Sequence, residues 1–171
     1  MVTAHCRGEL PDAFAPKHRW AMDWYYPVMT GVVRGEDALD RLESRRDTFF
    51  EGDKGIRCVS DRPWVTAAET CECLLAYLSL GRRDVALELF ASIQHLRSPE
   101  GHYYTGIVYP ELLHFPGDER STYTSASIVL AADALADASA ASQLFVDHDL
   151  LPALIDAESA EGDLATEQGR D

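Results

Sequence analysis

Apolar residues recur along the middle of the chain with helical spacing, and they do so in repeated pairs of segments. In each pair a mostly apolar segment is followed by a glycine and then by a more charged segment, a pattern typical of two helices joined by a turn. The expected pairs are 20–33 with 36–50, and 64–80 with 82–96, and a third copy begins near Ser121. The pattern predicts αα-hairpins, each with one buried helix and one outer helix.

The two complete pairs are related by a shift of 46 residues, which places Asp23 on Glu69 and Gly35 on Gly81. A repeat of this period means that one unit cannot bury its own apolar face, so that the copies must pack against one another. We therefore expect an all-α, repetitive fold of stacked αα-hairpins.

The chain divides into three parts by composition. Residues 1–18 contain Pro11 and Pro16 without a sustained period, so we expect an irregular leader there. Residues 19–150 form the expected helical domain. Residues 151–171 are acidic and free of aromatic side chains, which is typical of a mobile tail.

Charge and cysteine usage exclude several classes of function. The sequence has 29 acidic and 15 basic residues, a net charge of -14, which repels the phosphates of nucleic acid. It has no apolar run long enough to span a membrane and no signal peptide, so we expect a cytoplasmic protein. Without an export signal, the four cysteines are expected as reduced thiols: Cys6, Cys58, Cys71 and Cys73.

The end of the second unit resembles a known repeat. The Leu-Phe pair at 89–90, Gln94 and the Gly-His-Tyr run at 101–103 resemble the QW-type repeat of squalene and hopene cyclases. Three further regions, 22–27, 57–66, and 95–97 with 103–106, look like bacterial proteins called prenyltransferase-like. The resemblance covers residues 20–135 and implies a toroid of the terpenoid-cyclase and prenyltransferase kind with an elongated, isoprenoid-like ligand.

The metal and acid motifs of those enzymes are missing from the chain. It contains neither the Asp-x-Asp-Asp run of class II cyclases nor the Asp-Asp-x-x-Asp run of class I synthases. Cys71 and Cys73 are two residues apart, so on a helix their thiols point about 200° away from each other and cannot share one ion. We expect no metal and no cofactor.

Asp23 and Glu69 are the candidate catalytic residues, because the repeat places them at the same level of adjacent buried helices. Two carboxylates that face one cavity are what general acid-base chemistry on a glycosidic bond requires. Two structural alternatives remain open. Glu69 has the spacing of a capping box with Thr66, and Asp23 has the position for a hydrogen bond to the next loop.

Aromatic and charged residues near the starts of the expected inner helices are candidates for binding a substrate. Aromatic rings line isoprenoid pockets and also stack on sugars, and arginine clamps phosphate or carboxylate groups. Packing between repeats and pairing with nearby carboxylates are the alternatives. The candidates are Trp24, Tyr25, Arg57, Asp61, Trp64, Thr66, Arg97, Tyr103 and Tyr104.

Three functions follow from this picture. The leading hypothesis is a prenyltransferase-like or terpenoid-cyclase-like domain that binds a small or lipid-like molecule on an aromatic, acidic concave face. The alternatives are a carbohydrate-active toroid that uses Asp23 and Glu69, and a non-catalytic protein-interaction module. Because three hairpins make half a ring, we also expect a partner, either a second copy of the chain or a missing N-terminal half.

Overall fold

The computed structural model describes residues 17–150. Residues 1–16, which make up most of the expected leader, and residues 151–171, the expected tail, lie outside the described part.

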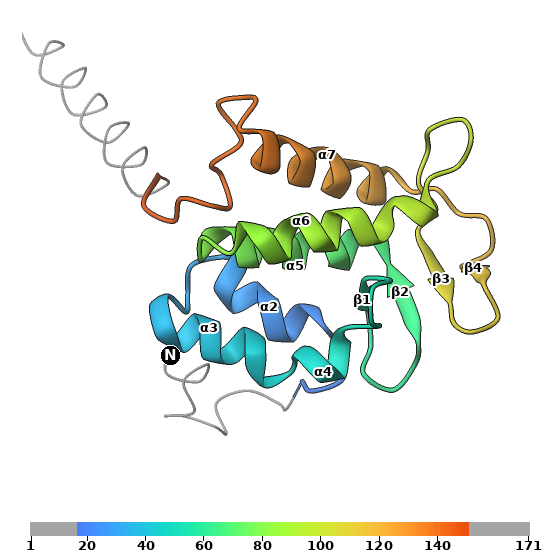
Figure 1. The fold of residues 1–171 in the computed structure, drawn as a ribbon, viewed down its shortest axis with the longest axis horizontal. Coiled ribbons are helices and arrows are strands. Elements are labelled where there is room, and N and C mark those ends of the chain that lie inside the picture. Colours follow the sequence, from blue (N-terminus) through green and yellow to red (C-terminus); the bar gives the residue numbers. More distant parts are fainter. Residues whose placement is uncertain (1–16, 151–171) are drawn as a thin grey trace, which may run out of the picture.

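Three helices, which we call the central helices, run in the same direction, and the middle one packs against the other two (Figure 1). They are α2 (Met22–Met29), α5 (Ala67–Ser79) and α7 (Thr122–Ala136). Two helices return in the opposite direction, α3 (Gly35–Ser44) after α2 and α6 (Arg83–Ser92) after α5. Two short turns of helix extend the returning helices, α4 (Arg46–Phe49) and the 3-10 helix η1 (Ile93–Leu96).

Helix α5 lies at the centre, packed against α2, α6 and α7. Nearly all of its residues are buried, which is why its sequence combines small and apolar side chains instead of a single apolar stripe. Helix α3 is amphipathic, and it buries Ala38 and Leu42 while its acidic residues face solvent. Its Arg41 side chain instead donates to two backbone carbonyls of α2. The Trp24 and Phe49 rings stack between α2 and α4 with their centroids 5.2 Å apart.

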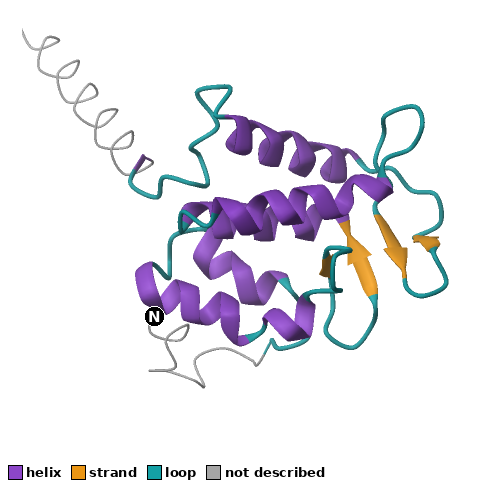
Figure 2. Ribbon diagram, viewed as in Figure 1, coloured by secondary structure: helices purple, strands orange, loops and turns teal. Residues whose placement is uncertain are grey.

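A four-stranded antiparallel sheet lies at the end where the three central helices begin (Figure 2). Its strands, in spatial order, are β1 (Ile56–Arg57), β2 (Trp64–Thr66), β3 (Gly106–Val108) and β4 (Leu113–Phe115). The prediction of an all-α toroid is therefore wrong, since the described fold is mixed α/β. Strands of two or three residues are too short to show the alternation of apolar and polar residues that identifies a strand in a sequence.

The strand pairing determines which side chains share a face of the sheet. Directly opposed residues of an antiparallel pair point to the same face. Val65 and Ile107 are paired, and both are buried in the core. The other face carries two rows, with Trp64, Val108 and Leu113 in the first and Thr66, Gly106 and Phe115 in the second.

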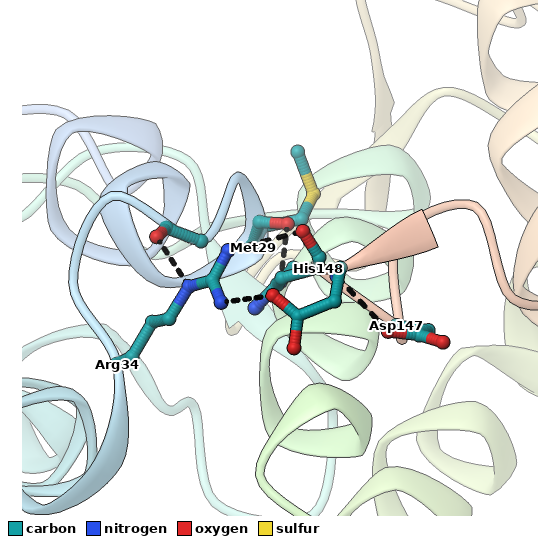
Figure 3. A network of polar contacts seen from close by, with 6 residues as sticks. Met29, Arg34, Asp147 and His148 are labelled. Atoms are coloured by element: carbon teal, nitrogen blue, oxygen red, sulfur yellow. Dashed lines mark hydrogen bonds and ion pairs between the residues drawn. The ribbon is translucent and has the colours of Figure 1, made fainter. Parts of the chain in front are cut away.

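The segment after α7 returns to the turn between α2 and α3 (Figure 3). The Arg34 guanidinium pairs with Asp149 at 2.7 Å and donates to the His148 carbonyl at 3.0 Å. The His148 ring donates from Nε2 to the Met29 carbonyl at 3.1 Å. Gly31 has a φ of 70°, a conformation that favours glycine, and a Cβ there would lie 2.7 Å from the His148 ring. Both the backbone conformation and the close approach of His148 therefore require glycine at this position.

Cys58, Cys71 and Cys73 are free, buried thiols in the described part of the chain. Between residues 17 and 150, no helix is long and apolar enough to cross a membrane.

Candidate active site

Glu69 lies in the first turn of α5, directly after strand β2. The Thr66 hydroxyl donates to the Glu69 carboxylate instead of capping a backbone N–H of the helix. The capping-box interpretation of this pair is therefore wrong. Burial raises the pKa of Glu69 above its ordinary value, the Thr66 hydrogen bond opposes this shift, and the nearby Glu72 adds to it.

Glu72 lies one helical turn after Glu69 and is only 8% exposed. Three tyrosine hydroxyls donate to its carboxylate: Tyr25 and Tyr26 from α2, the latter at 3.4 Å, and Tyr123 from α7. Burial raises the pKa of Tyr25, and the neighbouring charge of Glu72 raises it further. The Glu72 carboxylate thus joins all three central helices, close to the end where they begin.

The Tyr26–Glu72 contact joins two residues that are 46 positions apart, the same shift that relates the two helix pairs. Asp23 and Glu69 each lie three residues before these partners, in the first turns of α2 and α5. Asp23 forms an ion pair with Lys17 at 4.0 Å, and the Asp23 side chain is 23% exposed. The acidic group that the structure places beside Glu69 is Glu72.

Cys58 also lies near Glu69. Burial raises the pKa of this thiol to about 12, and the charge of Glu69 contributes to the increase. A thiol in such a setting is held in its neutral form. Within residues 17–150, no group of three or more His, Cys, Asp or Glu side chains is arranged to hold a metal ion.

The aromatic candidates are distributed over several places. Trp24 is 1% exposed and donates to the Arg41 carbonyl, so it belongs to the core. Tyr25 is fully buried, and its hydroxyl holds Glu72. Trp64 is half-buried on the sheet, with its ring centroid 5.3 Å from that of Phe115.

Tyr103 and Tyr104 lie between η1 and β3. The Tyr103 hydroxyl donates to Gln94 at 2.8 Å, and the Tyr104 ring stacks on His114 with 3.6 Å between centroids. The aromatic, Gln and Gly-x-aromatic residues that resemble the QW repeat thus make local contacts that join α6 and η1 to the following loop. The residue types alone do not distinguish such local packing contacts from a repeat of the cyclase kind.

Two of the charged candidates, Arg57 and Asp61, pair with neighbours other than Glu69. Arg57 forms an ion pair with Glu51. Asp61 pairs with Arg19 at 3.1 Å on the surface. The Arg97 side chain is exposed, and its backbone bridges to Tyr103. Among the described residues, the structure thus brings together Thr66, Glu69 and Tyr25 of the sequence-derived candidates, and adds Glu72, Tyr26, Tyr123 and Cys58.

Glu72 was not identified from the sequence, nor were its contacts with the three tyrosine hydroxyls, although one signal pointed to them. The shift of 46 residues that places Asp23 on Glu69 also places Tyr26 on Glu72, which puts a tyrosine and a carboxylate at equivalent levels of adjacent helices. Glu72 was overlooked because it lies within a run of small and apolar residues that reads as core.

The chain is similar to a glycosidase. It is 47% identical over 146 residues to the "MMP endo-(1,4)-3-O-methyl-alpha-D-mannosidase" of Mycolicibacterium hassiacum. The match covers 85% of this chain but 40% of the relative, so the chain spans less than half of that protein. No known family profile matches the sequence.

This similarity overturns the terpenoid-cyclase and prenyltransferase resemblance, and with it the leading hypothesis of an isoprenoid-like ligand. At 47% identity the mannosidase match extends over most of the chain, whereas the cyclase resemblance depended on short, loosely spaced motifs. The alternative of a carbohydrate-active protein agrees better with this mannosidase than the terpenoid-cyclase hypothesis does.

The raised pKa of Glu69 predicts how stability depends on pH. Between the ordinary glutamate pKa and the raised value, the folded protein binds a proton that the unfolded chain has lost, so stability falls as pH rises through this window. The side chain of the Glu69→Gln variant has no group that titrates in this pH window. As the pH rises above the ordinary glutamate pKa, chemical denaturation should show the Gln variant gaining stability relative to the unmodified protein until the raised pKa has been passed. A constant difference across this range would contradict the burial of the carboxyl group.

Proposed function

We propose that this chain carries the acidic site of a glycoside hydrolase that cleaves α-(1,4) linkages between 3-O-methyl-mannose units. The observation that carries this proposal is the 47% identity to an endo-acting 3-O-methyl-mannosidase. The Glu69 site supports it, because a carboxyl group with a raised pKa is what protonation of a glycosidic oxygen requires.

Glu69 has the properties of the general acid. It gives its proton to the oxygen of the leaving sugar as the bond from that oxygen to the anomeric carbon breaks. Water then bonds to the anomeric carbon and loses a proton to a second carboxylate. The repeat makes Asp23 our candidate for that base, since it lies in the first turn of the neighbouring helix α2, at the level equivalent to Glu69, while Glu72 is the acidic group next to Glu69 itself.

Glu72 has a supporting role in this scheme. Its carboxylate is held by three tyrosine hydroxyls and lies one turn from Glu69. A negative group there favours the positive charge that develops on the sugar ring in the transition state.

The chain spans about 40% of the relative, so the rest of the substrate cleft could come from further residues or from a second copy. The expected homodimer or missing N-terminal half stays a prediction, as does the cytoplasmic location. The division of the chain into residues 1–18, 19–150 and 151–171 also stays a prediction.

The test is incubation of the protein with an α-(1,4)-linked 3-O-methyl-mannose oligosaccharide, with products separated by mass. We expect internal cleavage into shorter methylated oligosaccharides. An α-(1,4)-linked glucose oligosaccharide of equal length is the control and should stay intact. Cleavage of neither sugar, by a protein that is folded by circular dichroism, would contradict the proposal for this chain.

A further inference from the structure

One face of the sheet carries apolar side chains that lie partly open to solvent. The half-buried Trp64 and Val108 face outward together with Leu113, which is 63% exposed, and with the half-buried Phe115. We call these four residues the apolar sheet face. Large apolar groups that share one open surface are unusual in a stable monomer and mark a binding surface.

The ring arrangement on this face depends on a glycine. The centroids of the Trp64 and Phe115 rings are 5.3 Å apart, with 38° between the ring planes. A Cβ at Gly106 would lie 2.5 Å from the edge of the Phe115 ring. Because Gly106 has no side chain, the Phe115 ring can lie across β3 toward Trp64. The Trp64 ring of β2 and the Phe115 ring of β4 therefore form one platform, although β2 and β4 are not neighbouring strands.

The apolar sheet face is continuous with the acidic site. Trp64 and Thr66 are two residues apart on β2 and point to the same face. The Thr66 hydroxyl donates to the Glu69 carboxylate. Strand residues rise about 3.3 Å each, so the platform begins roughly 7 Å from Thr66, a distance comparable to one sugar unit.

The chemistry of this surface matches a methylated sugar better than an unmethylated one. Aromatic rings stack on the C–H faces of sugars, and a methyl ether replaces a hydroxyl that would otherwise need a hydrogen-bond partner. The apolar side chains of Val108 and Leu113 extend the platform away from Glu69.

We propose that the apolar sheet face is the subsite that selects methyl ethers, with Trp64, Phe115 and Leu113 packing against the O-methyl groups of a mannose chain bound next to Glu69. This inference rests on the proposed function, because it takes from that function the identity of the sugar. It assigns the sheet, which the sequence did not predict, to substrate selection.

The test measures binding without turnover. In a Glu69→Gln background, saturation-transfer NMR and calorimetry would compare α-(1,4)-linked mannose oligosaccharides of equal length with and without 3-O-methyl groups. We expect the O-methyl protons to receive the most saturation from aromatic protons, and the methylated sugar to bind more tightly. Trp64→Ala should weaken binding of the methylated sugar by about tenfold and reduce its advantage over the unmethylated one.

Leu113→Ser provides a second variant, because its exposed position on an edge strand tolerates substitution even if Trp64→Ala fails to fold. We expect it to weaken binding of the methylated sugar alone, by about threefold. Leu87→Ser is the matched control, since Leu87 is 48% exposed on the outer helix α6 and should not affect either sugar.

The outcomes separate this inference from the proposed function. If the protein with Glu69 intact cleaves the sugar but both variants keep the full preference for methyl groups, the inference is wrong and the proposed function stands. If it cleaves nothing while both variants lose the preference, the inference stands and the hydrolase proposal fails. Equal binding of the two sugars, or no binding of either, overturns the inference.

Discussion

Replacing Glu69 by Gln should lower the hydrolysis rate by about 10² to 10⁴-fold while leaving the protein folded, because Gln keeps the shape of the side chain but has no proton to give. The measurement is kcat on the methylated oligosaccharide, together with the free energy of unfolding. Near neutral pH the variant should be at least as stable as the unmodified protein, since the substitution removes a buried carboxylate whose protonation is favoured by its surroundings.

Glu88→Gln is a suitable control, because Glu88 is exposed on α6 and the same chemical change there should leave kcat unchanged. Unchanged turnover in Glu69→Gln would exclude Glu69 as the general acid. A large loss of stability in that variant would instead show that the carboxylate is needed for folding.

Glu72→Ala should destabilise the protein by about 3 to 5 kcal/mol, because it leaves the hydroxyls of Tyr25, Tyr26 and Tyr123 without their acceptor and opens a cavity beside α5. Small domains have about 5 to 15 kcal/mol of total stability, so this is a large fraction. Urea denaturation measures the change. Glu72→Gln keeps an acceptor oxygen of the same shape and should cost clearly less.

Tyr25→Phe refines this test, since it removes one hydroxyl from the core and leaves the carboxylate with two donors. We expect a loss between that of Glu72→Gln and that of Glu72→Ala. If all three variants were as stable as the unmodified protein, the carboxylate would not be what joins α2, α5 and α7.

The positions of the helices could be predicted from the sequence because each central helix exceeds two turns and carries a recognisable apolar pattern. The segments expected at 64–80 and 82–96 contain α5 and α6, with the glycine turn between them at Gly81. The first residues of the expected helix at 64–80 belong instead to β2. Here Val65 pairs with Ile107, about 40 residues further along the chain, and such distant pairing leaves no local signal.

The acidic site was only partly predictable for a similar reason. Glu69 was identified through the repeat, whereas Glu72 depends on hydroxyls that reach it from two other helices. The direction of each tyrosine side chain is set by packing, which the sequence does not show. Trp24 illustrates the opposite error, since an aromatic residue next to Asp23 proved to be a core residue that stacks on Phe49.

The parallel direction of α2, α5 and α7 has an electrostatic consequence for the end of the molecule where they begin. Each helix N-terminus acts as about half a positive elementary charge, so three together create a positive potential there. That potential opposes a substrate that becomes cationic during bond cleavage. Asp23 and Glu69, in the first turns of α2 and α5, counter it, while α7 has no acidic residue in its first turn. Together with the Glu72 carboxylate, these two side chains let the site favour a cation although three helix N-termini lie there. The acidic side chains, and not the fold, thus determine which sign of charge the site stabilises.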